Sequence, residues 1–205
     1  MITIVDYEMG NTGSIANMFK YLGVASTIES DPDKIKNASK ILLPGVGSFD
    51  MAMKKIKEKN LDEVLNEKVL KEKTPLLGIC LGMQLLTNSS EEGKADGFGW
   101  IPAKSLSFKN RIDKRLKIPH MGWNLVHKKE ESLLTQGFEE LDEMRFYFVH
   151  SYFVQVEDEK NSILKTEYGL EFDSAIQKDN IFGAQFHPEK SHKFGMKLFE
   201  NFARL

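Results

Sequence analysis

The chain has 205 residues and a formal net charge of −2, and it contains 41% hydrophobic and 28% charged residues, proportions typical of a globular protein. No apolar run approaches the length of about 20 residues that a membrane span needs, and the small net charge argues against a broad surface for nucleic acid. A single cysteine, Cys80, excludes an internal disulfide and a thiolate metal cluster. The start, "MITIVDYEMGN", lacks the pattern of a signal peptide, so we expect a cytoplasmic protein with one domain over residues 1–205.

The N-terminal part of the chain alternates strand-like and helix-like segments. Ile15, Met18, Phe19 and Leu22, for example, have the spacing of one apolar helical face. Strands are expected at 2–7, 25–30, 40–47 and 75–80. Helices are expected at 15–22, 31–38, 49–71 with a break near Asn60, and 82–89. This alternation predicts parallel strands joined by crossover helices.

The C-terminal part is richer in short β segments. Strand-like runs lie at 145–156, 162–169, 174–177 and 181–188, and apolar residues at helical spacing follow at 194–202. We therefore predict the α/β class, with an open, mostly parallel sheet flanked by helices and with added β hairpins in the C-terminal half.

Cys80 lies between Gly78 and Gly82, where a predicted strand meets a predicted helix. Open α/β sheets bind ligands at the carboxyl ends of their strands, and glycines two residues on either side are typical of a strained nucleophile elbow. Backbone N–H groups at the start of the helix also favour a thiolate. The spacing alone leaves open that Cys80 is a small buried core residue.

A thiol nucleophile needs a base, and His187 in "FGAQFHPEK" is the best placed histidine. Pro188 keeps His187 in extended backbone, and in an extended segment Glu189 points to the same side as His187 and can orient its ring. By itself this pattern favours a surface histidine beside a solvated glutamate, and it gains weight only when it is considered together with the Cys80 turn.

Two further segments are candidates for the site. In "LLPGVGSF", Gly45 and Gly47 allow a sharp turn that can aim an N–H group at an oxyanion together with the N–H of Leu81, although the same loop is compatible with a simple turn. In "IPHMGWN", Trp123 is either a partner-binding residue or a core aromatic.

The motifs "PGVGSF", "GICLGMQLL", "PHMGWN", "FYFVHSY" and "QFHPEKS", in this order, resemble the class I (triad-type) glutamine amidotransferases over almost the whole chain. More narrowly, they are similar to the glutaminase subunits of imidazole glycerol phosphate synthase, the HisH family. The resemblance implies a glutaminase without cofactor or metal that converts glutamine to glutamate and ammonia through a γ-glutamyl thioester.

The resemblance also implies roles for individual residues. The catalytic triad would be Cys80, His187 and Glu189, and the oxyanion would be bound by Val46 or Gly47 and by Leu81, after a peptide flip in the PGVG loop. The residues that match the glutamine-binding positions are Gly45, Gln84, Glu92, Ser151 and Tyr152. The residues that match partner-facing positions are Asn11, His120, Trp123, Asn124, Tyr147 and Lys190.

The implied partner is a separate β/α-barrel cyclase of the HisF type, which forms a heterodimer with the glutaminase. The cyclase uses the channelled ammonia to make imidazole glycerol phosphate and AICAR in histidine biosynthesis. Glu8 stands where this family usually has glycine, so a related subunit that feeds a sugar amidotransferase in surface-glycan biosynthesis is an alternative. A stand-alone γ-glutamyl hydrolase and a catalytically silent scaffold are also compatible with these motifs.

Overall fold

The computed structural model describes residues 1–141 and 143–205. The strands are β1 (Ile2–Val5), β2 (Ser26–Glu29), β3 (Ile41–Leu43), β4 (Leu76–Ile79), β5 (Ser89–Ser90), β6 (Ala103–Ser107), β7 (His120–Leu125), β8 (His127–Lys128), β9 (Arg145–His150), β10 (Tyr152–Val156), β11 (Ser162–Glu167), β12 (Glu171–Lys178) and β13 (Ile181–Ala184). The α-helices are α1 (Thr12–Tyr21), α2 (Pro32–Ile35), α3 (Phe49–Glu58), α4 (Leu61–Asn66), α5 (Leu81–Leu85) and α6 (His192–Arg204).

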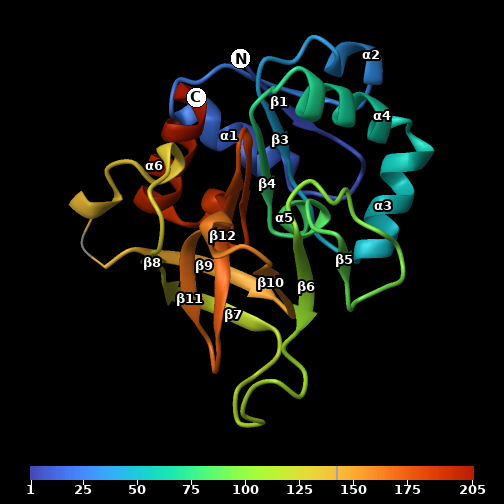
Figure 1. Cartoon of the computed structure of the whole chain (residues 1–205). Coiled ribbons are helices and arrows are strands. Elements are labelled where there is room, and N and C mark those ends of the chain that lie inside the picture. Colours follow the sequence, from blue (N-terminus) through green and yellow to red (C-terminus); the bar gives the residue numbers. More distant parts are fainter. Residues whose placement is uncertain (142) are drawn as a thin grey trace.

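The main sheet combines a parallel half with an antiparallel extension. Strands β2, β1, β3, β4 and β13 lie side by side and run parallel to one another. Strands β12, β10 and β6 continue the sheet with antiparallel pairing, and β11 and β8 branch from β12. The predicted α/β class, with an open sheet and added β hairpins, is confirmed (Figure 1).

Helices cover both faces of the parallel half because its strands are apolar on both sides. Within β1 and β3, Ile4 and Leu42 pack in one core cluster with Phe19 of α1 and Phe199 of α6. Their neighbours Val5, Ile41 and Leu43 pack in the second cluster, which contains side chains of α2, α3 and α4. Figure 1 shows α1 and α6 on one side of the sheet and α2, α3 and α4 on the other.

Two helices differ from the expected segments in an informative way. The predicted break near Asn60 is present, because Asn60 adopts a left-handed backbone conformation (φ 54°) between α3 and α4. Helix α5 ends at Leu85, earlier than expected, because the segment 97–101 takes the carbonyls that a longer helix would use: Phe98 N donates to Leu85 O and Ile101 N to Leu86 O. The elements that surround the expected nucleophile are nevertheless present.

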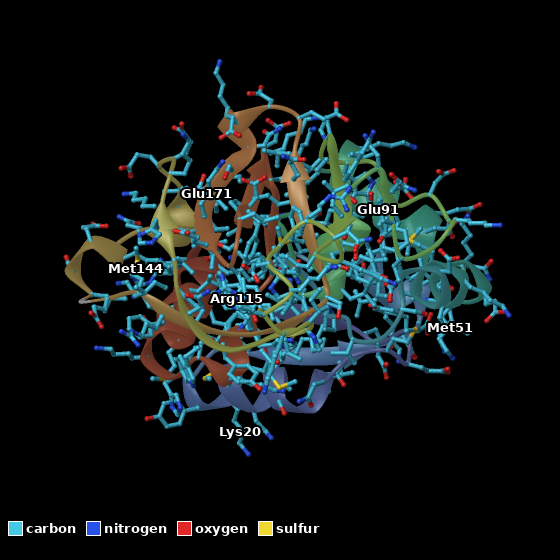
Figure 2. The ribbon with its side chains drawn as sticks, turned by 90° about the horizontal axis from the view of Figure 1, so that it is seen from below. Lys20, Met51, Glu91, Arg115, Met144 and Glu171 are labelled. Carbon is cyan, nitrogen blue, oxygen red and sulfur yellow. The ribbon has the colours of Figure 1, made fainter. Side chains whose placement is uncertain are left out.

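The run 145–156 forms two strands that belong to different sheets. β9 pairs antiparallel with β7 in a two-stranded sheet, whereas β10 joins the main sheet, and only Ser151 separates them. The loop between β6 and β7 extends below the main sheet in Figure 1. In the view from below, Arg115 of this loop lies near the centre of the molecule, with Glu91 and Met144 on opposite sides (Figure 2). Within residues 1–141 and 143–205, no helix has the length and apolar character required to cross a bilayer.

Candidate active site

A cavity of about 350 Å³ lies at the carboxyl ends of the parallel strands. Cys80 follows β4 directly, and His187 follows β13, the strand beside it. The cavity is lined by Val46, Gly47, Cys80, Leu81, Gln84, Glu92, Pro119, Val149, His150, Ser151, Tyr152 and His187. Its volume suits a small molecule, and most of the residues expected in the site lie on its wall.

Cys80 lies on a strained turn between β4 and α5. Its backbone has a φ of 55° and a ψ of −110°, an unusual conformation for a residue with a side chain. The flanking glycines are required by close packing: a Cβ on Gly78 would lie 2.6 Å from the Gly82 carbonyl oxygen, and a Cβ on Gly82 would lie 1.9 Å from that of Leu43. The turn leaves the sulfur on the cavity wall with the residue only 7% exposed, so Cys80 is both part of the core and open to a ligand.

His187 is held from three directions. Its Nδ1 lies 2.8 Å from Glu189 Oε1, and both side chains are buried. Its backbone N–H donates to Tyr147 O at 2.9 Å, and the Ser191 hydroxyl donates to the His187 carbonyl oxygen at 2.6 Å. The expected extended backbone ends at His187, because Pro188–Lys190 form a 3-10 turn, and this turn brings Glu189 to the ring.

The surroundings of His187 favour its charged form. Burial by itself lowers the pKa of the ring, but the Cys80 sulfur and the Glu189 carboxylate outweigh burial and raise the pKa of His187 to about 10. The other ring nitrogen, Nε2, has no hydrogen-bond partner among the described residues. A charged imidazole beside a sulfur, with one N–H still uncommitted, is the arrangement that a thiol nucleophile and its base require.

The glycine loop after β3 closes one side of the cavity. Val46 and Gly47 lie on its wall, and Gly47 has a φ of 108°, which disfavours any residue with a side chain. The N–H of Leu81, one of the expected oxyanion donors, donates to the Gly45 carbonyl oxygen at 3.3 Å in this conformation. The loop therefore occupies the donor that the reaction would need.

The residues expected to bind the substrate surround the same cavity. Gln84, Glu92, Ser151 and Tyr152 line it, whereas Gly45 lies behind the wall, against the Tyr7 hydroxyl. Glu92 Oε2 accepts the backbone N–H of Phe49 at 2.9 Å, which fixes the carboxylate beside the start of α3. Burial, followed by the charges of Glu92 and Glu91, raises the pKa of Tyr152, so the Glu92 charge is felt across the cavity.

Three of the expected partner-facing residues lie together at the surface with His192, which was not expected there. We call this group the Trp123 cluster: Trp123, Tyr147, Lys190 and His192. Trp123 is 45% exposed and stacks on His192, with ring centroids 5.4 Å apart. Lys190 Nζ lies 5.6 Å from the centre of the Tyr147 ring. Asn11 is exposed at the N-terminus of α1, where its side chain accepts the N–H of Ser14. Trp123 is thus a surface residue and not a core aromatic.

His120, also expected at the partner face, is only 3% exposed and belongs to a buried polar chain. His120 Nδ1 lies 2.9 Å from His150 Nε2, and His150 Nδ1 lies 2.7 Å from Tyr152 O. Asn124 Nδ2 lies 3.2 Å from His120 Nε2. Because the Tyr152 carbonyl can only accept, the chain forces Nδ1–H on both rings, with each Nε2 accepting.

Several residues at the site were not anticipated from the sequence, and three of them make polar contacts there. His150 lines the cavity, Ser191 holds the backbone of His187, and Gln185 lies 3.7 Å from the sulfur through its Nε2. Ser191 and Gln185 flank the FHPE motif, so their nearness to His187 in the chain is a signal that was available. His150 had a similar signal, because it adjoins Ser151 and Tyr152 in the FYFVHSY motif, but its other partner, His120, comes from another part of the chain.

Glu8, the departure from the usual glycine, has a φ of 68°. A left-handed backbone at this position explains the usual glycine. In this chain the Glu8 carboxylate forms ion pairs with Lys55 and Lys59 of the neighbouring helix region, and these ion pairs lower its pKa to about 2. The departure is therefore accommodated away from the cavity.

Comparisons with known proteins place the chain among relatives of one kind. The model of the family described as "Glutamine amidotransferase class-I" matches residues 3–205. Imidazole glycerol phosphate synthase subunit HisH 2 of Methanococcus maripaludis is 57% identical over 204 residues, which cover 100% of this chain and 99% of that protein. Subunit HisH of the same synthase from Sulfurimonas denitrificans is 50% identical over 207 residues, covering 100% and 98% of the two chains. A solved glutamine amidotransferase superposes with a TM-score of 0.76 over 100% of both chains at 14% identity, a likeness of fold.

Proposed function

The chain belongs to the class-I glutamine amidotransferase family, and on that premise we propose that it is a glutaminase subunit, one domain over residues 1–205, that hydrolyses glutamine to glutamate and ammonia. The observation that carries the proposal is the presence of Cys80 and His187 on the wall of one cavity at the rim of the sheet, with Glu189 at the His187 ring. The names of the relatives, which are subunits of imidazole glycerol phosphate synthase, support histidine biosynthesis as the pathway.

In the first half of the proposed reaction, the Cys80 thiolate attacks the side-chain carbonyl carbon of glutamine. A C–S bond forms, and the carbonyl oxygen takes up negative charge. The oxyanion then collapses, the C–N bond breaks, and His187 Nε2–H protonates the leaving nitrogen, which departs as ammonia. The product on the enzyme is a γ-glutamyl thioester at Cys80.

In the second half, water replaces ammonia. Neutral His187 takes a proton from the water, whose oxygen attacks the thioester carbonyl, and the C–S bond breaks to release glutamate and the Cys80 thiolate. Glu189 stays a carboxylate throughout, and it orients His187 and stabilises the imidazolium. One water and one glutamine thus give one glutamate and one ammonia.

The oxyanion needs N–H donors, but in this conformation the Gly45 carbonyl oxygen accepts the N–H of Leu81. We propose that the peptide between Gly45 and Val46 rotates, which removes the Gly45 carbonyl from Leu81 N–H and presents the Val46 N–H to the cavity. The rotation changes ψ of Gly45 and φ of Val46, and Gly45 has no side chain to oppose it. In the resting conformation the hydrolysis is then slow, and a loop change accelerates it.

Glutamine would be held through its amino-acid end by Gln84, Glu92, Ser151 and Tyr152, with the Glu92 carboxylate suited to the α-ammonium group. The ammonia would pass to a separate β/α-barrel cyclase of the HisF type, which binds at the Trp123 cluster and makes imidazole glycerol phosphate and AICAR. Ammonia is largely protonated in water at neutral pH, so a protected route preserves its reactivity.

The test is the release of glutamate from glutamine by the chain alone and with a HisF-type barrel. Wild type with the barrel should turn over glutamine faster than the chain alone, and Cys80→Ala should abolish release in both mixtures while the thermal unfolding transition is retained. Full turnover without any barrel would instead favour a stand-alone hydrolase. Unchanged turnover in Cys80→Ala would exclude the triad.

A further inference from the structure

The catalytic sulfur is in contact with a buried amide that the proposed mechanism does not use. Gln185 is fully buried, and its Nε2 lies 3.7 Å from Cys80 Sγ. Its Oε1 lies 3.1 Å from Nε2 of Gln84, which is 4% exposed. Gln185 therefore bridges the nucleophile and a second buried amide.

The orientation of this bridge follows from a single backbone carbonyl. Gln84 Nε2 lies 3.1 Å from Tyr152 O, and a carbonyl oxygen can only accept, so the atom of Gln84 at this place must be its NH2 group. The same NH2 group faces Gln185, so Gln185 must present its oxygen to Gln84. The NH2 group of Gln185 is then left to face the sulfur. The assignment holds without any assumption about the protonation of Cys80.

The Tyr152 carbonyl is itself held on the other side. His150 Nδ1–H donates to it at 2.7 Å, and His150 is in turn held by His120 at 2.9 Å. These hydrogen bonds hold the Tyr152 carbonyl in place, and the carbonyl in turn determines the orientation of the Gln84 and Gln185 amide groups. The result is a buried hydrogen-bond chain that ends at the sulfur.

We propose that Gln185 is a positioning residue that directs an N–H donor at the Cys80 sulfur and so favours the thiolate. A charged sulfur is a better acceptor than a thiol, so a fixed donor stabilises the ionised form preferentially. On the other side of the sulfur, the Val149 carbonyl oxygen at 4.0 Å accepts from the thiol and favours the neutral form. The N–H donor of Gln185 counteracts this effect of the Val149 carbonyl on the ionisation of Cys80. This inference rests on the proposed role of Cys80 as nucleophile.

The experiment uses the fact that Cys80 is the only cysteine of the chain, so thiol chemistry on the intact protein reports on this site alone. The Gln185→Met variant keeps the length of the side chain and removes the donor. The ultraviolet absorbance of the thiolate at neutral pH, measured against Cys80→Ser, and the rate of reaction with methyl methanethiosulfonate are the two readouts. Gln155→Met is the matched control, because Gln155 is exposed on β10.

We expect Gln185→Met to lose most of the thiolate absorbance and to react about tenfold or more slowly, whereas Gln155→Met matches wild type. Wild-type absorbance and rate in Gln185→Met would overturn the proposal, as would the lack of a thiolate signal in wild type. Failure of the glutaminase proposal would be seen separately, as thiol effects of the expected kind without any release of glutamate from glutamine.

A measurement on wild type covers the case in which Gln185→Met fails to fold. The side-chain NH2 resonances of Gln185 should shift when methyl methanethiosulfonate caps Cys80, because the capped sulfur no longer carries charge. Those of Gln155 should not shift. Unmoved Gln185 resonances on complete capping would contradict the contact and the proposal with it.

Discussion

His187 Nδ1 and Glu189 Oε1 lie 2.8 Å apart because the backbone after His187 turns through a 3-10 helix. Pro188 begins that turn, and Ser191 fixes its other end by donating to the His187 carbonyl oxygen. The pair is buried, so the Glu189 carboxylate acts on the ring with little solvent screening. The contact between His187 and Glu189 therefore depends on Pro188 and Ser191, which have no part in the proposed reaction.

Replacing Glu189 with glutamine tests this relationship. Glu189→Gln keeps the size of the side chain but removes the charge that stabilises the imidazolium, so glutamate release with the barrel present should fall by about 100-fold or more. Steady-state kinetics measure the effect. Glu63→Gln, an exposed change of the same kind on α4, should leave the rate unchanged. Equal rates for Glu189→Gln and wild type would remove Glu189 from the triad.

The packing around the turn at Cys80 predicts a stability change. In Gly82→Ala the new Cβ would lie 1.9 Å from the Leu43 carbonyl oxygen, so β3 and α5 must move apart, and we expect a loss of about 2 kcal/mol or more in the free energy of unfolding. Gly13→Ala in α1 has no atom within 4 Å of its Cβ and should raise stability by about 0.5–1 kcal/mol. Urea unfolding of both variants gives the comparison, and a Gly82→Ala protein as stable as wild type would contradict the close packing.

The two buried histidines predict sensitivity to acid. Burial lowers the pKa of His120 to about 4 and of His150 to about 3, from an ordinary value of 6.5. The unfolded chain therefore takes up these protons first, so their contribution to stability is fully present above pH 6.5 and is lost as the pH falls toward 4. The His120→Gln variant lacks one of these two titrating rings. The difference in the free energy of unfolding between wild type and the variant should therefore fall by about 1.4 kcal/mol per pH unit over this range.

Urea unfolding between pH 7 and pH 4 measures that difference. His127→Gln is the control, because His127 is exposed on β8, and its curve should run parallel to that of wild type. Parallel curves for wild type and His120→Gln would show that His120 is not held neutral in the folded protein.

The Trp123 cluster predicts a binding change without a folding change. Trp123 is 45% exposed, so Trp123→Ala should alter the free energy of unfolding by less than about 1 kcal/mol. If the barrel seats on this ring, the variant should bind it about tenfold or more weakly, measured by titration calorimetry. Tyr21→Ala, 77% exposed on α1, should bind like wild type. Undiminished binding by Trp123→Ala would place the partner on another face.

The parts of the fold that follow local rules could be predicted from the sequence. The strands β1, β3 and β4 are short apolar runs, and the apolar face of α1 has regular helical spacing, so burial alone determines them. The end of α5 could not be predicted, because Phe98 and Ile101 capture its carbonyls from outside the segment. Nor could the separation of β9 from β10, because a one-residue break leaves the apolar pattern intact.

The site shows the same division. Cys80 stood out because two glycines flank it, and His187 stood out because a proline follows it. The burial of His120 could not be predicted, because the rings that stack on it, Phe148 and Tyr168, are remote in sequence. The position of Gln185 beside the FHPE motif was a signal, but its contact with Gln84 could not be predicted, because Gln84 lies on α5, 101 positions away in the chain.

Only one residue, Ser151, connects β9 of the small sheet to β10 of the main sheet, so a movement of one sheet is transmitted to the other. His150 is the last residue of β9, paired in register with His120, and Tyr152 is the first of β10 and lines the cavity. A sliding of the small sheet cannot be taken up by a loop, because Ser151 itself is part of the cavity wall. A tilt of β7 at the surface is therefore expected to reshape the cavity that we propose as the active site.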